Sequence, residues 1–463
     1  MNRYRQTFFY LLIDFASAFV AWLLFNVFRY YETAQYNFST LSDFLLYYQV
    51  LKGQILIPVF WLILHAISGY YNKPFGKSRL GELFTTFMTI LAGAIIIFFV
   101  VVLNEIPHSF HIFYHLFFAL VLIQFVLTYT CRVLMTNHII KKIRRREWFE
   151  TALIIGTGKN ADKARENMRE LGYQIAGFVR AKEEPETSVV PAEEIIGVTD
   201  ELAELIEQRK IDEIVVAIDS GNIAKLMYSL YRYKKPVKIM AEKNDLLMNV
   251  KAKTIHGIPF IDVTENNFSE FEKNIKWLID KAIAAFVLTV CSPLFAFIAI
   301  RVKIGSKGPV FFKQERIGYR GNPFNIYKFR TMYTDATKQG PLLTAIGDAR
   351  VTSFGRFLRK YRLDEIPQFW NVLKNEMSLV GPRPEQRYFI DRIVEKAPYY
   401  YLLHNVRPGI TSWGMVKYGY AETVDKMIER LDFDILYYEN MSLILDITIM
   451  IYTVKIVFTG KGV

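Results

Sequence analysis

The sequence contains only two cysteines among 463 residues, Cys131 and Cys291, and each lies inside an apolar stretch. Two isolated thiols support neither a disulfide framework nor a four-ligand zinc site. Long runs of lysine and arginine are also absent, although the formal net charge is +12. The basic residues stand beside apolar segments instead, which favours anionic lipid or phosphorylated substrates over nucleic acid. These absences predict a reduced, cytoplasm-facing protein with no nucleic-acid partner.

Apolar residues are abundant, since 52% of the residues are hydrophobic and 15% are aromatic. Four apolar stretches, at about 8–28, 50–67, 84–103 and 112–134, are long enough to cross a bilayer. No small-residue cleavage site follows the first stretch, so we expect a membrane span there and not a signal peptide. Asp14 lies within that span, and because a charge is costly in hydrocarbon, we expect it to face another helix.

Basic residues predict how the four spans, assigned to a domain of residues 1–145, are oriented. They precede the first span, separate the second from the third, and follow the fourth, while the other two loops carry almost none. The positive-inside rule then places both ends of the domain in the cytoplasm. The residues concerned are Arg3, Arg5, Lys73, Lys77, Arg79, Lys141, Lys142, Arg144, Arg145 and Arg146. Anchoring is the simplest function for this domain, and dimerisation and lipid entry are the alternatives.

The middle of the chain, residues 146–263, alternates strand and helix patterns and predicts a Rossmann-like α/β domain with a parallel sheet. Gly156 and Gly158 follow the first strand and resemble the glycine-rich turn of dinucleotide-binding folds. The acid that would hold the ribose is absent, because Arg180 stands near the end of the second strand. We therefore expect a regulatory or structural domain, with Gly156 and Gly158 as a possible nucleotide site.

An uncharged run at 282–300 is just long enough to cross a bilayer, yet basic residues flank both of its ends. Ser292 and Pro293 lie near its midpoint. Proline interrupts a helix, and the serine hydroxyl can satisfy a freed backbone group. We predict a re-entrant helix that bends and returns to the cytoplasmic side, with a kinked but complete span as the alternative.

Two adjacent acids, Asp364 and Glu365, follow a group of basic residues and precede Pro367. Proline suits the first turn of a helix, so we expect the acids at a helix start, where free N–H groups keep carboxylates ionised and attract phosphate. A carboxylate can attack phosphorus when cations or a metal cancel the repulsion. By spacing alone, a helix cap beside a solvated basic face is the alternative. The basic residues are Arg356, Arg359, Lys360 and Arg362.

Four motifs occur in order in the C-terminal part of the chain: Ser292-Pro293, KFRTM at 328–332, LDEIPQ at 363–368 and GPRP at 381–384. In these motifs the chain resembles the bacterial sugar transferases, the polyprenyl-phosphate glycosyl-1-phosphate transferases, in their long form. The resemblance implies a multi-domain membrane protein with a four-helix transmembrane bundle, a Rossmann-like middle domain and a catalytic domain at 264–463. That last domain is expected to be α-rich, with the re-entrant helix and an interfacial C-terminal helix at about 443–458.

The resemblance also implies a reaction, in which a hexose-1-phosphate passes from a UDP-sugar to undecaprenyl or another polyprenyl phosphate and UMP is released. Asp364 would form the covalent intermediate and Glu365 would hold Mg²⁺. Phosphate contacts are expected from Lys328, Arg330, Arg359 and Arg383, and a uridine or sugar pocket is one interpretation of His404, Arg407 and Trp413. The reaction would prime exopolysaccharide, capsule or O-antigen synthesis at the bacterial inner membrane, with the soluble domains in the cytoplasm.

A homodimer is compatible with this interpretation. Two other functions stay open on the sequence: a membrane-tethered NAD-dependent sugar-nucleotide epimerase or dehydratase centred on the middle domain, and a non-catalytic nucleotide-sensing scaffold. The missing ribose acid counts against the first, and the intact acid pair counts against the second.

Overall fold

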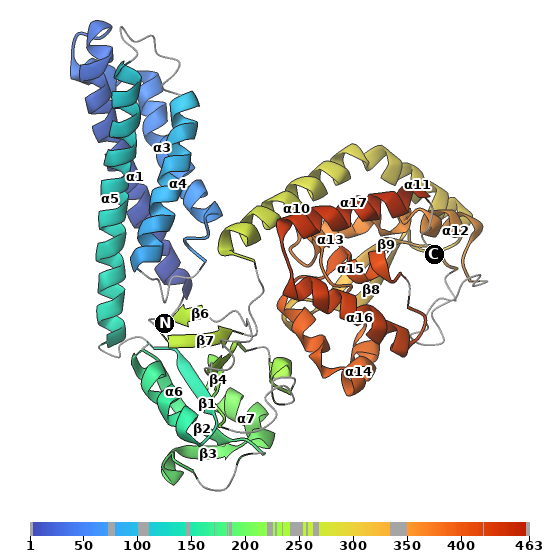
Figure 1. Ribbon diagram of the computed structural model, residues 1–463. Helices are drawn as coiled ribbons and strands as arrows, with labels where there is room; N and C mark the ends of the chain where they lie inside the picture. The colour runs from blue at the N-terminus through green and yellow to red at the C-terminus, as the bar shows by residue number, and fades with distance from the viewer. Residues whose placement is uncertain are drawn as a thin grey trace. The chain divides into compact units, whose positions relative to one another are not determined.

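The computed structural model describes residues 3–72, 79–100, 111–144, 149–170, 172–182, 184, 188–219, 226, 229–233, 235–240, 253–255, 258–262, 268–333, 350–419 and 421–459. Lys73, Lys77, Arg145, Arg146 and the expected domain boundaries near residues 145 and 263 lie outside these ranges. The chain divides into two compact units, the first formed mainly by Met1–Glu150 and the second by most of the remainder. Each part is described by itself (Figure 1).

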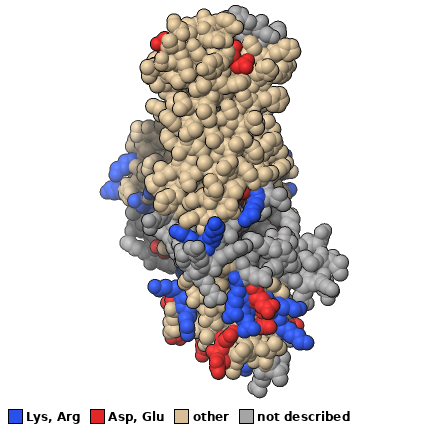
Figure 2. Space-filling view, turned by 90° about the vertical axis from the view of Figure 1, so that its left-hand side faces the viewer, with Lys and Arg blue, Asp and Glu red and all other residues tan. Residues whose placement is uncertain are grey.

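Four long helices form the N-terminal bundle: α1 (Arg3–Glu32), α3 (Tyr48–Ile67), α4 (Arg79–Val100) and α5 (His111–Arg144). Each contains a segment long and apolar enough to cross a membrane, which confirms the four expected spans. The short helices η1 (Ala34–Tyr36) and α2 (Leu41–Leu45) connect α1 to α3. Figure 2 shows a face of the bundle that carries almost no charged side chains between its two ends.

Asp14 of α1 faces another helix, as expected, and its partner is Arg132 of α5. Arg132 donates from Nε and Nη2 to the two Asp14 carboxylate oxygens at 2.9 and 2.7 Å, and from Nη1 to Thr86 Oγ1 of α4 at 2.8 Å. Tyr71 also donates to Asp14, at 2.7 Å. Both charged side chains are buried. The pair therefore joins three of the four helices.

The middle domain is built on a seven-stranded sheet in the order β3-β2-β1-β4-β5-β7-β6. Neighbouring strands are parallel from β1 to β4 and from β4 to β5, which confirms the Rossmann-like expectation, whereas β7 runs antiparallel to β5. The elements are β1 (Thr151–Ile155), α6 (Lys159–Glu170), β2 (Gln174–Arg180), η3 (Ala192–Glu194), β3 (Ile195–Val198), η4 (Thr199–Glu201), α7 (Leu202–Gln208), β4 (Glu213–Val216), η5 (Tyr231–Tyr233), β5 (Val237–Met240), β6 (Lys253–Ile255) and β7 (Ile258–Asp262).

The C-terminal region is mainly helical, with an antiparallel hairpin of β8 and β9 and a short parallel pair of β10 and β11, in agreement with the expected α-rich domain. Its elements are α10 (Glu270–Val290), α11 (Ser292–Gly305), β8 (Phe311–Ile317), η6 (Tyr319–Gly321), β9 (Pro323–Phe329), α12 (Ser353–Lys360), η8 (Leu363–Gln368), α13 (Phe369–Leu373), β10 (Ser378–Val380), α14 (Arg387–Lys396), η9 (Pro398–Asn405), β11 (Gly409–Thr411), α15 (Trp413–Lys417), α16 (Val424–Glu439) and α17 (Leu443–Thr459).

The expected helix break occurs at Cys291, where α10 and α11 meet at an angle of 62°. Ser292 Oγ donates to the Thr289 carbonyl at 2.8 Å, and Pro293 lies in the first turn of α11, where its missing N–H is not needed. The helix before the break begins at Glu270, well before the uncharged run. The bend is thus confirmed, and the return to the same side of the membrane stays a prediction.

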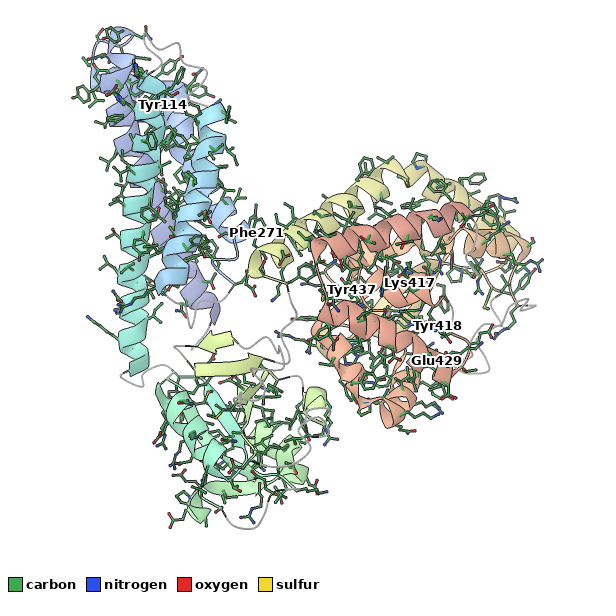
Figure 3. The ribbon with its side chains drawn as sticks, viewed as in Figure 1. Tyr114, Phe271, Lys417, Tyr418, Glu429 and Tyr437 are labelled. Atoms are coloured by element: carbon green, nitrogen blue, oxygen red, sulfur yellow. The ribbon has the colours of Figure 1, made fainter. Side chains whose placement is uncertain are left out.

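Helix α17 packs one face inward and leaves an apolar stripe outside. Ile444 and Phe458 are 78% and 82% exposed, whereas Ile449 and Asp446 are buried. Asp446 accepts from Lys276 Nζ of α10 at 2.6 Å and from the Tyr437 hydroxyl of α16 at 2.7 Å. Figure 3 labels Tyr437. These bonds explain how an apolar helix carries an acid, and the exposed stripe fits the expected interfacial helix.

Candidate active site

The two adjacent acids lie in the first turn of a helix. Arg362 adopts a left-handed backbone conformation with φ of 52°, and η8 begins at the next residue. Asp364 and Glu365 therefore lie at a helix start, as expected. Pro367 does not open a new helix, however: it lies inside η8, and α13 begins at Phe369.

Glu365 is held by cations from two elements. Lys328 of β9 donates from Nζ to Glu365 Oε1 at 2.6 Å, and Arg362 Nη1 lies 3.6 Å from Oε2. Both acids are only 8% exposed. Among the described side chains, none donates a hydrogen bond to the Asp364 carboxylate or pairs with it. Glu365 is thus fixed by side chains, whereas the Asp364 carboxylate accepts a hydrogen bond from its own backbone N–H.

Burial and the surrounding charges together shift the pKa values of the two acids in opposite directions. Burial alone would raise the pKa of Glu365, but Lys328, Arg383 and Arg362 outweigh it and lower the pKa to about 2. Burial and the neighbouring Glu365 charge raise the pKa of Asp364, and Lys328 and Arg359 oppose this only in part. Glu365 is therefore the more acidic member of the pair, and Lys328 and Arg359 favour the ionised form of Asp364.

Three of the four expected phosphate-binding cations act on the acids. Lys328 bonds directly to Glu365, the charge of Arg383 acts on Glu365, and that of Arg359 acts on Asp364. Arg359 is oriented by a bond from Nε to Thr331 Oγ1 at 2.9 Å. Arg383 places Nη1 3.2 Å from Met415 Sδ.

Arg330 faces elsewhere. It lies just beyond the end of β9 and is buried, and its guanidinium donates to the backbone carbonyls of Ser306, Pro309 and Val302. These bonds fasten the end of α11 to the β8–β9 hairpin. The structure does not bring Arg330 to the acids, so its role in phosphate binding stays a prediction that its present contacts do not favour.

The structure contains a buried ionic cluster directly after the GPRP motif that the sequence analysis did not predict. Glu385 accepts from Arg430 Nη2 of α16 at 2.6 Å and from Arg316 Nη1 of β8 at 3.0 Å, and Arg383 Nε lies 3.9 Å from it. Burial would raise the pKa of Glu385, but Arg430, Arg316 and Arg383 lower it. Its position one residue after the motif is the only signal that marks it in the sequence.

The GPRP loop is pinned to the stretch that contains the expected pocket residues. Gly381 N donates to Thr411 O at 3.1 Å, and a Cβ at Gly381 would lie 2.3 Å from the Arg407 carbonyl, so only glycine fits. This backbone contact brings the GPRP motif beside β11.

The three residues expected to form a uridine or sugar pocket contact other groups of the protein. Arg407 donates from Nε to Asn375 O at 3.2 Å, and the Lys417 ammonium lies 4.7 Å from the Trp413 ring centre. His404 lies edge-on to the rings of Tyr400 and Tyr401. A role of His404, Arg407 and Trp413 in a sugar pocket stays a prediction.

Among the described residues, no cluster of three or more histidine, cysteine or acidic side chains is arranged to hold an ion. Mg²⁺ does not require such a cluster, because it is often held by one or two carboxylates together with phosphate oxygens and water. The adjacent acids Asp364 and Glu365 supply carboxylate oxygens, the ligand type that such an ion takes.

The two candidate glycines of the middle domain lie in the β1–α6 turn, as expected. Gly156 has φ of +133°, and a Cβ there would lie 2.3 Å from the Ala217 carbonyl. At Gly158, a Cβ would lie 2.1 Å from the Asp219 carboxylate. At both positions a neighbouring group lies too close for a Cβ atom, which explains why the residue is glycine.

Comparison with known proteins identifies two family matches. Residues 271–460 match the bacterial sugar transferase family, and residues 66–241 match a family described as a CoA-binding domain. The first match contains all the predicted catalytic and phosphate-binding residues, and the second contains the β1–α6 glycine turn.

Individual relatives indicate the same family. An N-acetylgalactosaminephosphotransferase of Aeromonas hydrophila, which acts with undecaprenyl phosphate, is 43% identical over 41% of this chain and 44% of its own length. The uncharacterised sugar transferase EpsL of Bacillus subtilis is 41% identical over 41% of this chain and 90% of its own length. The undecaprenyl-phosphate galactose phosphotransferase of Salmonella typhimurium is 26% identical over 98% of this chain and 95% of its length.

The chain spans about half the length of several of the curated relatives that it matches. The EpsL match covers nearly all of that relative, and the bacterial sugar transferase match at residues 271–460 contains the acid pair and its cations. This chain belongs to the bacterial sugar transferase family.

Proposed function

We propose that this protein transfers a hexose-1-phosphate from a UDP-sugar to undecaprenyl or another polyprenyl phosphate and releases UMP. The observation that carries the proposal is the unequal pair of buried acids, in which Glu365 is tied to Lys328 and Arg362 while Asp364 is not bonded to any described side chain. The names of the Aeromonas and Salmonella relatives, both undecaprenyl-phosphate phosphotransferases, support the same reaction class.

In the first step, an Asp364 oxygen attacks the β-phosphorus of the UDP-sugar. A bond forms between that oxygen and phosphorus, and the bond to the bridging oxygen breaks, so UMP leaves with the electron pair. Lys328, Arg359 and Arg383 lower the repulsion between the carboxylate and the anionic diphosphate. The product of this step is a sugar phosphate esterified to Asp364.

In the second step, a phosphate oxygen of the lipid acceptor attacks the phosphorus of this aspartyl phosphosugar. The Asp364–phosphorus bond breaks and the carboxylate is regenerated, which leaves a polyprenyl diphosphosugar. When bound, Mg²⁺ supplies positive charge that offsets the charge on the diphosphate. Glu365, with Asp364 beside it, is the residue that would hold the ion, because its low pKa keeps it ionised.

The bent helix pair α10–α11 and the exposed stripe of α17 support a catalytic site at the membrane surface. We place that site at the cytoplasmic face of the bacterial inner membrane, where the sugar nucleotide and the phosphate head of the lipid both reach it. The reaction would prime exopolysaccharide, capsule or O-antigen synthesis.

Isotope exchange tests the proposed covalent step. Exchange of labelled UMP into the UDP-sugar requires the Asp364 intermediate but no lipid acceptor, so Asp364→Asn should abolish it with UDP-glucose, UDP-galactose and UDP-N-acetylgalactosamine alike. Asp425→Asn is the matched control, because Asp425 is an exposed acid of the same region that pairs with Lys396. Undiminished exchange in Asp364→Asn would refute the covalent step.

A further inference from the structure

The glycine turn of the middle domain is filled by the chain's own acids. In dinucleotide-binding folds, the N–H groups at the start of the first helix and the turn before it bind a diphosphate. Here the two oxygens of Asp219 accept from Lys159 N at 2.7 Å and Asn160 N at 2.8 Å, the first two residues of α6. Asp219 follows β4, the strand beside β1. One carboxylate thus occupies the position of a phosphate group.

A second acid closes the turn from the other side. Glu184, in the loop after β2, accepts from Thr157 N at 3.0 Å and from Thr157 Oγ1 at 3.2 Å. Val189 N and Val190 N both donate to Thr157 O, at 2.9 and 3.2 Å, so this loop also covers the turn. Thr157 is only 1% exposed. The backbone that would face a diphosphate is therefore covered by protein.

The presence of glycine at position 158 has a structural explanation that does not involve a nucleotide. A Cβ at Gly158 would lie 2.1 Å from Asp219 Oδ2, so glycine is needed for the carboxylate to reach the helix start. In a nucleotide-binding turn the same residue type lets the backbone approach the pyrophosphate. Contacts within the protein thus explain the glycine pattern that resembles a nucleotide site in the sequence.

We infer that the middle domain is closed to CoA and to dinucleotides at its glycine turn, because Asp219 and Glu184 occupy the anion positions there. An incoming diphosphate would have to displace both carboxylates and would meet their negative charge. The residues present do not fit the cofactor that the CoA-binding family description suggests. The inference does not depend on the transferase chemistry of the C-terminal region.

Titration of the full-length protein in detergent with CoA and with NAD⁺ tests this inference directly. Neither compound is a substrate of the proposed reaction, and the Gly158→Ala variant distinguishes binding at this turn from binding elsewhere. We expect no saturable heat from either compound. Saturable binding that Gly158→Ala weakens would overturn the inference.

Amide hydrogen exchange tests the internal cap itself. A hydrogen bond to a charged group contributes enough that its loss should speed exchange at Lys159 and Asn160 about tenfold or more in Asp219→Ala. Asp200→Ala is the control, because Asp200 is an exposed acid of the same domain that pairs only with the exposed Lys182 among the described side chains. Asp219→Asn, which keeps one acceptor oxygen, should give an intermediate rate. Unchanged exchange in Asp219→Ala would contradict the cap.

Discussion

At the scale of single residues, the site shows how neighbouring acids with the same exposure acquire different roles. Asp364 and Glu365 are equally buried, yet among the described side chains the hydrogen bonds and ion pairs of this pair are made to Glu365. The pKa of Glu365 is consequently lowered to about 2, while that of Asp364 is raised. Lys328, Arg362 and Arg383 thus favour the charged form of Glu365 more strongly than Lys328 and Arg359 favour that of Asp364.

This difference predicts opposite stability effects for two isosteric substitutions. Folding disfavours ionised Asp364, whose pKa is raised, so Asp364→Asn should raise the unfolding temperature at pH 7 although it abolishes activity. Folding favours ionised Glu365, so Glu365→Gln should lower that temperature. Thermal unfolding of the two variants beside the wild type measures both effects, and shifts of the same sign would contradict the described charge distribution.

The pH dependence of the Glu365 contribution follows from the same pKa. Its folded-state pKa of about 2 lies below the ordinary value of 4.5, so its contribution is fully present above pH 4.5 and is lost as the pH falls toward 2. The difference in unfolding temperature between the wild type and Glu365→Gln should therefore shrink over this range. A difference that stays constant between pH 6 and pH 3 would show that Lys328 and Arg362 do not hold an ionised Glu365.

At the scale of helices and strands, the sequence predicts features whose causes are local. The helix break at Ser292-Pro293 and the helix start at the acid pair each depend on residues a few positions apart. The four spans are also predicted, since each is a continuous apolar stretch.

Contacts between distant segments could not be predicted in this way. Arg132 lies 118 residues from Asp14, and Glu385 lies 69 and 45 residues from Arg316 and Arg430. The sequence around a single charged residue does not indicate which distant residue forms an ion pair with it. Arg330 illustrates the converse: its place in the KFRTM motif suggests a phosphate contact, but the backbone carbonyls after α11 take its donors.

The Glu385 cluster predicts a large stability effect of one substitution. Glu385→Ala would leave Arg316 and Arg430 buried without their shared counter-charge, and loss of one partner from a buried ion pair costs about 3–5 kcal/mol. Glu422→Ala is the control, because its pair with Lys426 is exposed and is worth at most about 1 kcal/mol. Denaturant unfolding compares the two variants, and equal losses would show that the cluster does not hold β8, α16 and the GPRP loop together.

At the scale of the whole molecule, the proposed reaction requires that the chain after α11 lie on the same side of the membrane as the N-terminus. Basic residues before the first span and after the fourth favour this orientation, and the broken helix α10–α11 allows the chain to return without crossing.

Cysteine labelling from the periplasmic side tests this topology. In a background with Cys131 and Cys291 replaced by serine, Arg301→Cys should stay unlabelled by an impermeant reagent in intact cells. Asn37→Cys, in the loop between α1 and α3, should be labelled and is the positive control. Labelling of Arg301→Cys would show that α10–α11 is a kinked but complete span.

The most direct test of the account is the identification of the covalent intermediate. The protein is incubated with a UDP-sugar labelled in its β-phosphate, without lipid acceptor, and its peptides are analysed by mass spectrometry. We predict that the label and the mass of a hexose phosphate appear on Asp364 and disappear when polyprenyl phosphate is added. A peptide containing Asp364 that stays unmodified, while the same preparation transfers sugar phosphate to the lipid, would contradict the central claim.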